Sequence, residues 1–342
     1  MLKILLLSRY GRLAASTRYR FGQYLPYLQQ QGINVTEAPL LDDAYLQRFY
    51  ETGRQKSLSH LIQAYSKRLN HLFRASSYDL IWVQMEVLPW IPNWIERILL
   101  GRRTPYLVDY DDAWFHCYDQ HSSYWVRKLL GKKIDRVMKE AAFVVAGNDY
   151  IARHAKKAGA KNIEIIPTVV DLEHYPITKQ PNNELFTIGW IGTPPTSHHL
   201  QSIHDALKVV SQGDHTQVVA IGDTSLKMEG VNLQVKPWNP QTEVEEIERF
   251  DVGIMPLFDS SFERGKCGLK LIQYMACARP VIASPVGVNR QIVQDNENGF
   301  QAMTTEEWLQ AFRLLRANPE KRQQFGQAGR AQIESTYCLQ RT

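Results

Sequence analysis

The segment from Arg264 to Lys270 places basic side chains and two glycines around a predicted helix start. A strand is expected over residues 252–256, a polar loop over 259–267, and a helix from about residue 268 to 277. The first turn of a helix carries backbone N–H groups without partners inside the helix, and glycine lets a ligand approach the backbone closely. This pattern is typical of a phosphate-binding site. A glycine-punctuated surface loop with solvated lysines fits the spacing equally well.

A second phosphate-binding candidate follows the strand predicted over residues 186–191. Gly192 and Thr193 lie in the turn after this strand, and Thr196 or Ser197 could cap the next helix. Helix starts of this kind bind anions through backbone N–H groups. The adjacent residues 198 and 199 are both histidines, which we interpret as incidental rather than catalytic.

Four arginines follow the strand predicted over residues 3–8: Arg9, Arg12, Arg18 and Arg20. A guanidinium group binds phosphate in a bidentate geometry, so this loop could hold an anionic group. A solvated basic helix start is the alternative, because Ser16 and Thr17 suit an ordinary N-cap.

Three carboxylates, Asp109, Asp111 and Asp112, lie at the end of the strand predicted over residues 106–109. Repulsion between like charges could raise the pKa of at least one of them. Such a carboxylate could accept a proton from a hydroxyl group or orient a sugar. The Asp-x-Asp spacing also fits a divalent-metal site, and Asp109 or Asp112 could instead cap a turn or pair with the arginines.

The elements that must position these residues alternate short apolar strands with helix-length segments, which indicates parallel sheets with crossover helices. In the first half, strands are predicted over residues 3–8, 34–40, 79–84, 106–109, 143–147 and 163–167. In the second half, they are predicted over residues 186–191, 217–221, 233–236, 252–256 and 281–284. Ligands bind beyond the carboxyl ends of parallel strands, so the residues of interest belong on strand-to-helix loops.

The predicted fold is an α/β protein with two Rossmann-like parallel-sheet domains facing across a cleft. Residues 171–185 contain two prolines and two asparagines without a sustained apolar period, which is typical of a linker. We therefore expect a first domain over residues 1–172, a linker over 173–185 and a second domain over 186–342.

Composition excludes several classes of protein. The chain has 342 residues, 44% of them hydrophobic, which is enough for two packed cores. Its apolar runs are far shorter than the roughly 20 residues that span a bilayer, and no signal peptide precedes the first strand, so a cytoplasmic protein is expected. The four cysteines show no paired zinc spacing and no secreted disulfide framework, so no metal site is predicted.

The charge is unevenly distributed along the chain. Residues 1–176 carry 24 Lys+Arg against 17 Asp+Glu, or +7, and the remaining residues carry 16 against 18, or −2. The first half would therefore favour an anionic partner such as a phospholipid surface. Nucleic acid is not expected, because no basic run with interleaved aromatics is present. A basic amphipathic helix predicted over 124–141 could dock on a membrane, but a core-facing crossover helix is the favoured interpretation.

Residues 252–300 resemble the donor-binding signature of GT-B glycosyltransferases, in particular glycosyltransferase family 4 (group 1), in a subgroup with a Gly-Lys-Cys-Gly motif. The matching segment reads VGIMPLFDSSFERGKCGLKLIQYMACARPVIASPVGVNRQIVQDNENGF. Further segments resemble the family in the expected order: ASTRYRFGQYLPYL, YLVDYDDAWF, VVAGNDYIARHA, NIEIIPTVVDLEHY and IGWIGTPPT. Several such matches in order are more specific than any one of them.

The resemblance implies transfer of a sugar from a nucleotide diphosphate donor, bound mainly by the C-terminal domain, to an acceptor bound mainly by the N-terminal domain. The implied donor-site residues are Gly192, Thr193, Arg264, Gly265, Lys266, Gly268, Leu269, Lys270 and Gln273. The implied contacts on the acceptor or phosphate side are Ser16, Arg18 and Arg20. No metal or bound cofactor is expected, because the GT-B fold generally works without a metal, and the nucleotide sugar is a co-substrate.

The expected catalytic residues are Lys266, Asp111 and Asp112. Lys266 would stabilise negative charge on the leaving diphosphate. The two aspartates would orient the acceptor hydroxyl or accept its proton. By resemblance, the enzyme is a hexosyltransferase of the retaining type that works in cell-surface polysaccharide or glycolipid synthesis. Its expected partners are the donor and a sugar, polysaccharide or lipid-linked acceptor, with peripheral contact at the inner face of an anionic membrane.

Four positions depart from the family pattern, the mildest being Ala278, which replaces a usual glycine. Gln273 stands where a glutamate usually holds the ribose, and Gly265 stands where another glutamate usually contacts the donor sugar. Asp111 occupies the position of a frequent histidine. These departures leave two alternatives open: a nucleotide-sugar-binding protein that has lost transfer, and a GT-B-type epimerase. A dehydrogenase is disfavoured, because no Gly-x-Gly-x-x-Gly follows the first strand.

Overall fold

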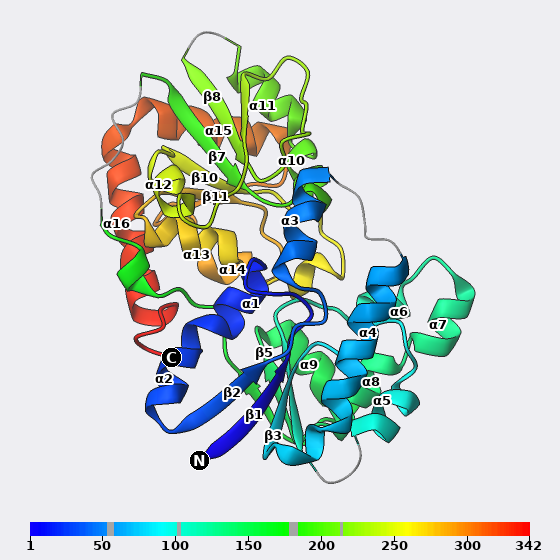
Figure 1. The fold of residues 1–342 in the computed structure, drawn as a ribbon. Coiled ribbons are helices and arrows are strands. Elements are labelled where there is room, and N and C mark those ends of the chain that lie inside the picture. The colour runs from blue at the N-terminus through cyan, green and yellow to red at the C-terminus, as the bar shows by residue number, and fades with distance from the viewer. Residues whose placement is uncertain (53–57, 101–103, 178–183, 213–214) are drawn as a thin grey trace. The chain divides into compact units, whose positions relative to one another are not determined.

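The computed structural model describes residues 1–52, 58–100, 104–177, 184–212 and 215–342. The chain divides into two compact units, which Figure 1 draws as a ribbon. Unit 1 contains residues 1–168 together with the short segment Arg264–Cys267, and unit 2 contains residues 169–263 and 268–342. Residues 178–183 of the predicted linker lie outside the described part of the chain.

Unit 1 is built on a six-stranded sheet in the order β2-β1-β3-β4-β5-β6, with every neighbouring pair parallel. Its strands are β1 Leu2–Leu7, β2 Ile33–Glu37, β3 Leu80–Gln84, β4 Tyr106–Tyr110, β5 Phe143–Ala146 and β6 Ile163–Ile165. The inner strands are apolar because helices cover a parallel sheet on its faces. The core of the unit includes the buried residues Leu5, Val83, Val108 and Val144.

Nine α-helices occur among the described residues of unit 1: α1 Ala15–Arg20, α2 Leu25–Gln30, α3 Asp43–Thr52, α4 Leu58–Phe73, α5 Asn93–Leu100, α6 His116–Asp119, α7 Tyr124–Leu130, α8 Lys133–Glu140 and α9 Asp149–Ala158. Two 3-10 turns are also described: η1 Gly22–Tyr24 lies between α1 and α2, and η2 Ala75–Ser77 lies between α4 and β3. The ends of α9 are encoded locally. The Asn148 side chain accepts a hydrogen bond from Ile151 N at its start, and Gly159, at φ +92°, ends it in the left-handed conformation.

Unit 2 contains a second six-stranded parallel sheet, in the order β12-β11-β10-β7-β8-β9. Its strands are β7 Phe186–Ile191, β8 Thr216–Ile221, β9 Leu233–Lys236, β10 Val252–Met255, β11 Val281–Ala283 and β12 Gly299–Gln301. Every residue of β7 and of β10 is buried. The two strands at the centre of this sheet are therefore covered on both faces.

The α-helices described in unit 2 are α10 Ser197–Gln201, α11 His204–Val210, α12 Glu243–Glu248, α13 Leu269–Ala276, α14 Asn289–Ile292, α15 Thr305–Ala317 and α16 Pro319–Thr336. The 3-10 turns are η3 Leu172–His174, η4 Pro194–Thr196 and η5 Glu263–Gly265. Helix α15 begins with a capping box, in which Thr304 and Glu307 satisfy each other's backbone N–H groups.

The predicted α/β class with two parallel sheets is confirmed. All eleven predicted strands are present, with ends that differ from the prediction by at most three residues. β12 was not predicted. It has only three residues and begins with Gly299, so it lacks the apolar run by which a buried strand is recognised.

The single helix predicted over residues 124–141 is wrong. The structure has two helices, α7 and α8, separated by Gly131 and Lys132. The interruption lets Lys133 turn into the interior, where its side chain is fully buried. The predicted core-facing apolar stripe is confirmed for α8. In α7 the stripe is divided: Leu130 is buried and Val126 packs against the core, whereas Trp125 and Leu129 are each 64% exposed.

Each sheet has one point where the strand order reverses: between β1 and β3 in unit 1, and between β7 and β10 in unit 2. Ligands of open α/β sheets bind beyond the carboxyl ends of the strands at such switch points. The loops that follow these four strands are therefore the first places to examine for a functional site. Among the described residues, no helix combines the length and apolar character needed to cross a bilayer.

Candidate functional site

The turn after β7 lies at the switch point of unit 2. A side chain at Gly192 would collide with the ring of Trp190, because an added Cβ would be 2.3 Å from that ring. The hydroxyl of Thr196 donates to the carbonyl oxygen of Thr193 at 2.9 Å, and Ser197 donates to that of Pro194 at 2.8 Å. Thr196 is the N-cap residue of α10, as predicted, but neither hydroxyl makes a side-chain capping bond. Instead, each hydroxyl donates to a carbonyl oxygen three residues earlier and stabilises the turn.

Helix α13 begins in the manner expected for an anion-binding helix start. Its N-cap, Gly268, has φ +69°, a left-handed conformation that favours glycine. Because glycine has no side chain, no side chain of the cap residue covers the helix start. The next residues, Leu269 and Lys270, are partly exposed. The ammonium group of Lys270 lies 4.6 Å from the centre of the Trp190 ring, in a cation–π contact. This contact orients a positive charge at the first turn of the helix.

Gln273 is buried on α13 and forms part of a polar cluster. Its side-chain amide donates to the carboxylate of Glu243 on α12 and, at 3.2 Å, to the hydroxyl of Tyr175. Glu243 also accepts a hydrogen bond from the indole N–H of Trp238. The structure thus places a carboxylate directly beside the amide where the family pattern has a glutamate. Sequence reasoning missed Glu243 and Trp238, because both lie outside the segments that carry the resemblance.

The segment Arg264–Cys267 is held within unit 1 by the loops after β4 and β5. The amide nitrogen of Asn148 lies 2.7 Å from the carbonyl oxygen of Gly265 and 3.2 Å from that of Lys266. The thiol of Cys267 donates to the backbone oxygen of Asp111 at 2.7 Å. Burial raises the pKa of the Cys267 thiol well above its usual range, so it serves as a neutral donor.

The close packing around Gly265 explains why glycine stands where the family pattern has a glutamate. A Cβ at this position would lie 2.3 Å from the Cβ of Ala113 and 2.8 Å from its backbone nitrogen. Real Cβ atoms essentially never approach that closely, so a glutamate cannot be accommodated here without moving the segment. Glu263 does not replace it, because its carboxylate accepts a hydrogen bond from the Ser260 hydroxyl in unit 2.

Asp111, Asp112 and Lys266 lie together at the carboxyl end of β4. The ammonium group of Lys266 is 3.9 Å from a carboxylate oxygen of Asp112. Burial, followed by the negative charge of Asp112, raises the pKa of Asp111 to about 7. A carboxyl group with that pKa can exchange protons near neutral pH. The structure therefore brings all three predicted catalytic residues into one unit.

Arg20 is held by other groups of unit 1. Its guanidinium group forms a bidentate ion pair with Asp109, with distances of 2.8 and 3.1 Å, and donates to the carbonyl oxygen of Ile166 at 2.7 Å. Because Arg20 is only 3% exposed, it supports the end of β4 rather than presenting a surface to a ligand. The same pair shows that Asp109 is structural, one of the alternatives left open by the sequence.

Arg18 and Ser16 are partly exposed residues of α1. Arg18 donates to the carbonyl oxygen of Leu13 at 2.9 Å. The alternative interpretation of Ser16 and Thr17 as an N-cap is wrong, since α1 begins at Ala15 with Ala14 in the cap position. Both residues therefore lie inside the first turn of the helix.

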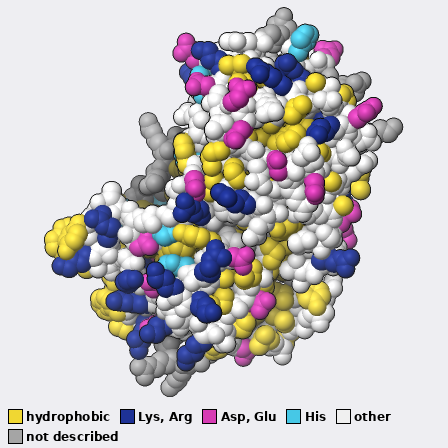
Figure 2. Space-filling view, turned by 180° about the vertical axis from the view of Figure 1, so that it is seen from behind, with side chains coloured by type: hydrophobic (Ala, Val, Ile, Leu, Met, Phe, Trp, Pro, Cys, Tyr) yellow, Lys and Arg dark blue, Asp and Glu magenta, His cyan; other side chains and the backbone are white. Residues whose placement is uncertain are grey.

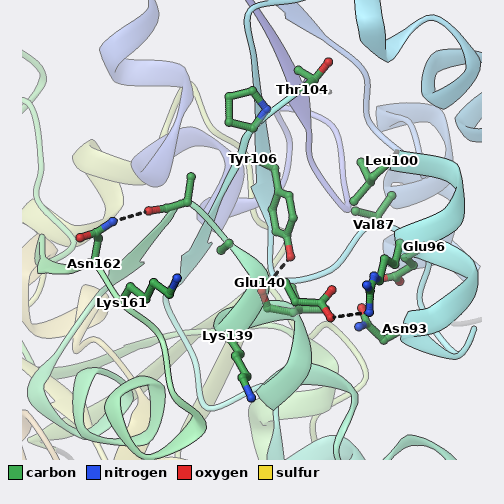
Figure 3. A pocket seen from close by; sticks show the side chains of 15 residues that line it. Val87, Asn93, Glu96, Leu100, Thr104, Tyr106, Lys139, Glu140, Lys161 and Asn162 are labelled. Atoms are coloured by element: carbon green, nitrogen blue, oxygen red, sulfur yellow. Dashed lines mark hydrogen bonds and ion pairs between the residues drawn. The ribbon is translucent and has the colours of Figure 1, made fainter. Parts of the chain in front are cut away.

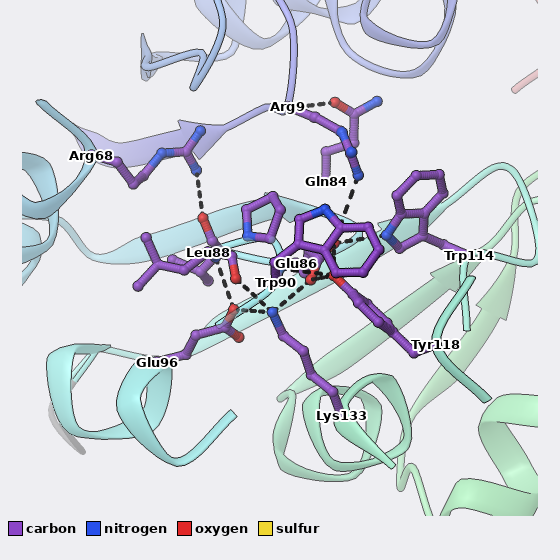
Figure 4. Close-up of polar contacts among 12 residues, drawn as sticks. Arg9, Arg68, Gln84, Glu86, Leu88, Trp90, Glu96, Trp114, Tyr118 and Lys133 are labelled. Carbon is purple, nitrogen blue, oxygen red and sulfur yellow. Dashed lines mark hydrogen bonds and ion pairs between the residues drawn. The ribbon is translucent and has the colours of Figure 1, made fainter. Parts of the chain in front are cut away.

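A buried polar cluster at the switch point of unit 1 was not predicted (Figure 4). Glu86 accepts hydrogen bonds from the Trp114 indole at 2.7 Å and from the Tyr118 hydroxyl at 2.9 Å. The ammonium nitrogen of Lys133 lies 2.6 Å from a carboxylate oxygen of Glu86 and 2.8 Å from one of Glu96. A guanidinium nitrogen of Arg9 is 3.7 Å from a carboxylate oxygen of Glu86. The same guanidinium group lies 4.1 Å from the centre of the Trp114 ring. The cluster ties the loops after β1, β3 and β4 to α8.

A pocket of about 540 Å³ lies elsewhere in unit 1 (Figure 3). Its wall includes Tyr106 at the amino end of β4, Ala142 just before β5 and Asn162 just before β6. It therefore opens at the opposite edge of the sheet from Asp111 and Asp112, and none of the predicted site residues lines it. Size alone does not make this pocket the functional site.

Part of the second half of the chain matches a known protein family. Residues 185–318 match the family described as glycosyl transferases group 1. TuaH of Bacillus subtilis, a glycosyltransferase assigned to teichuronic acid biosynthesis, is 21% identical over 310 residues, covering 78% of this chain and 76% of TuaH. The matched family region contains the turn after β7 and the start of α13.

Solved structures share the fold over nearly the whole chain. HepE of Anabaena, in complex with UDP and glucose, superposes with a TM-score of 0.72 at 16% identity, covering 99% of this chain and 96% of HepE. Sucrose-phosphate synthase of Thermosynechococcus elongatus gives a TM-score of 0.71 at 15% identity, with coverages of 99% and 96%. The fold is that of the GT-B glycosyltransferases, and the match to the group 1 glycosyltransferase family covers residues 185–318.

Proposed function

We propose that this protein transfers a sugar from a nucleotide diphosphate sugar to a hydroxyl group of an acceptor. The observation that carries the proposal is the start of α13, where Gly268 adopts a left-handed conformation directly before a helix that follows a buried parallel strand. The backbone N–H groups of such a helix start bind a diphosphate. HepE, which shares the fold, was solved in complex with UDP and glucose, and this favours uridine nucleotides as the first donors to test.

Within this proposal, residues 186–342 form the donor side and residues 1–172 the acceptor side. The diphosphate contacts are Gly192, Thr193, Arg264, Gly265, Lys266, Gly268, Leu269 and Lys270. The positive charge of Lys266 would stabilise the leaving diphosphate, because preorganised charge is most effective where negative charge develops. No bound metal is needed for that role, although Mg²⁺ carried by the nucleotide is compatible with it.

Glu243 would compensate for the missing ribose glutamate. The amide of Gln273 donates to this carboxylate, so a charged acceptor of hydrogen bonds lies beside the residue that stands in place of the family's glutamate. A carboxylate accepts a ribose hydroxyl more strongly than an amide does, because the hydrogen bond is charge-assisted. Gln273 then acts as a positioning residue for Glu243.

Asp111 and Asp112 would contact the acceptor hydroxyl, from which a carboxylate can accept the proton. The raised pKa of Asp111, about 7, suits a group that takes up a proton near neutral pH. We further propose hexosyl transfer with retention of configuration, in the synthesis of a cell-surface polysaccharide or glycolipid. The relationship to TuaH, which is assigned to teichuronic acid biosynthesis, supports an acceptor of that kind.

We also propose that unit 1 contacts the inner face of an anionic membrane through α7. Tyr124, Trp125 and Leu129 are between 58% and 64% exposed. Lys128 lies 5.3 Å from the centre of the Trp125 ring and 5.8 Å from that of Tyr124. At the left edge of Figure 2, where α7 lies, hydrophobic side chains protrude next to Lys and Arg side chains. Aromatic and basic residues together favour the headgroup region of a bilayer.

Incubation with a panel of UDP-, GDP- and ADP-sugars tests the activity. Slow release of the nucleoside diphosphate in water, accelerated by a hydroxyl acceptor, supports a transferase. Donor binding without release supports the binding protein, and an isomerised sugar supports the epimerase.

Lys266→Ala tests the diphosphate site. It should weaken binding of the preferred nucleotide by roughly 10- to 100-fold, since a hydrogen bond to a charged group contributes about 1.5–3 kcal/mol. Lys132→Ala, at a side chain that is 79% exposed, is the matched control and should bind normally. Unchanged affinity in Lys266→Ala would remove this residue from the proposal.

A further inference from the structure

Two histidines and a glutamate meet at the switch point of unit 2. His198 and His199 lie on α10, which follows β7, and Glu263 ends the loop that follows β10. Since β7 and β10 are neighbours in the sheet, these two loops leave the same edge side by side. The topology therefore brings together side chains that are more than sixty residues apart in the sequence.

The three side chains are close enough to share one ion. One ligand atom from each, an imidazole nitrogen or a carboxylate oxygen, lies within 4.8 Å of the other two. Nε2 of His199 is 3.6 Å from Oε1 of Glu263. Bonds of about 2.1 Å to a tetrahedral ion place its ligands roughly 3.4 Å apart. The His199–Glu263 distance already matches this value, and His198 needs only a small side-chain movement.

The surroundings hold the ligands in place. His199 is 2% exposed, and the Ser260 hydroxyl donates to the second oxygen of the Glu263 carboxylate. Phe258 lies beside both imidazoles, with its ring centre 5.9 Å from that of His198 and 5.6 Å from that of His199. Partners that orient a ligand in this way strengthen metal binding. His198 is exposed and gives an ion a path from solvent.

We propose that His198, His199 and Glu263 bind one divalent transition-metal ion such as Zn²⁺. Two imidazoles and one carboxylate are a ligand set that Zn²⁺ accepts, with a fourth position open to water or another oxygen ligand. Mg²⁺ and Ca²⁺ prefer oxygen ligands and should not compete. The ion would link the loops after β7 and β10. This site goes beyond the proposed sugar transfer and does not depend on it.

Titration of the metal-free protein with Co²⁺ tests the site. We expect one equivalent to produce the visible absorption bands of a cobalt ion with nitrogen and oxygen ligands, without a near-ultraviolet band from sulfur. An equivalent of Zn²⁺ should abolish these bands, and Mg²⁺ in large excess should leave them unchanged. The measurement requires neither nucleotide nor acceptor, so it stands or falls separately from the transferase assay.

Two variants test two of the three proposed ligands. His199→Ala and Glu263→Gln should each weaken Co²⁺ binding by at least about 100-fold, because even the loss of an outer-shell partner costs roughly 10- to 100-fold. His204→Ala is the matched control: this histidine lies on α11 and bonds the carbonyl oxygen of Glu229. Glu263→Gln can still bond to Ser260, so its fold should persist. Binding that both variants leave intact, or no stoichiometric binding at all, would overturn the proposal and leave an ordinary ion pair.

Discussion

The side-chain amide of Asn148 donates to the carbonyl oxygen of Gly265, with a nitrogen–oxygen distance of 2.7 Å, and joins residues 117 positions apart. The carbonyl oxygen of the same side chain caps α9 by accepting from Ile151 N at 3.0 Å. One side chain thus serves as a helix cap and as an anchor for the segment Arg264–Cys267. These two roles use different atoms and can be separated by mutation.

Asn148→Asp should release the segment while keeping the cap. A carboxylate still accepts from Ile151 N, but it cannot donate to Gly265 or Lys266. Loss of these bonds should cost about 1–2 kcal/mol of local stability. Limited trypsin digestion measures the effect, since Arg264 and Lys266 are cleavage sites in the segment. Cleavage there should accelerate severalfold with little change in the melting temperature. Equal rates in the variant and the parent would show that Asn148 does not anchor the segment.

Gly265→Ala should have a similar effect for a steric reason. The added Cβ would meet the Cβ of Ala113 at 2.3 Å, so the segment must move away. Gly22→Ala is a suitable control, because its nearest heavy atom, the Thr17 carbonyl oxygen, would lie at an ordinary 3.6 Å. We expect faster trypsin cleavage and weaker nucleotide binding for Gly265→Ala alone. If both variants behave like the parent, the close approach at Gly265 has no functional consequence.

The fold was accessible from the sequence for a simple reason. Strands buried on both faces consist of continuous apolar runs, and β7 and β10 are fully buried examples. Glycine at a left-handed helix start also leaves a local trace, which is why the start of α13 could be placed near Gly268. Both signals depend only on neighbouring residues in the chain.

Pairs that form across the fold left no such trace. Lys133 meets Glu86 from a helix 47 positions further along the chain, and Gln273 meets Glu243 from 30 positions away. Neither pair has a characteristic spacing, because the topology of the sheet sets their approach. The pairing of Arg20 with Asp109, 89 residues away, is an alternative that the sequence raised but that spacing alone could not select.

Proton transfer by Asp111 should be visible in the pH dependence of turnover. A carboxyl must be ionised to accept a proton, so kcat/KM should rise as the pH increases through about 7, the pKa of Asp111. In Asp112→Asn this limb should move to lower pH, because a neighbouring negative charge that raises the pKa is gone. Asp149→Asn, at an exposed position of α9, should leave the profile unchanged. A limb that persists in Asp111→Asn would assign the titration to another group.

Lys133→Met should strongly destabilise unit 1. The variant would leave Glu86 and Glu96 without the ammonium group that lies within 2.8 Å of both, at a cost of about 3–5 kcal/mol. Lys132→Met is the control, since the side chain of that lysine is 79% exposed and pairs with the partly exposed carboxylate of Asp135. Chemical denaturation provides the comparison. Similar stabilities for the two variants would show that the buried charges are compensated without Lys133.

Glu96 should make the stability of the parent depend on pH. Burial raises its pKa to about 7 in the folded protein, from an ordinary value of 4.5. Between these values the folded protein keeps a proton that the unfolded chain releases, so the free energy of unfolding should fall as the pH rises from 4.5 to 7 and then level off. Glu96→Gln should remove this part of the dependence. An identical slope in the variant would contradict the assignment to Glu96.

Membrane contact through α7 can be separated from contact through charge alone. The double variant Trp125→Ser with Leu129→Ser removes two side chains that are each 64% exposed while keeping Lys128. Since insertion of a large apolar side chain contributes about 1.5–3 kcal/mol, binding to vesicles containing anionic phospholipid should fall by tenfold or more at about physiological salt. Ile177→Ser, at a position 66% exposed in unit 2, should bind like the parent. If the double variant also binds like the parent and 0.5 M salt removes all binding, the basic residues act without insertion of α7, and this helix is not the contact surface.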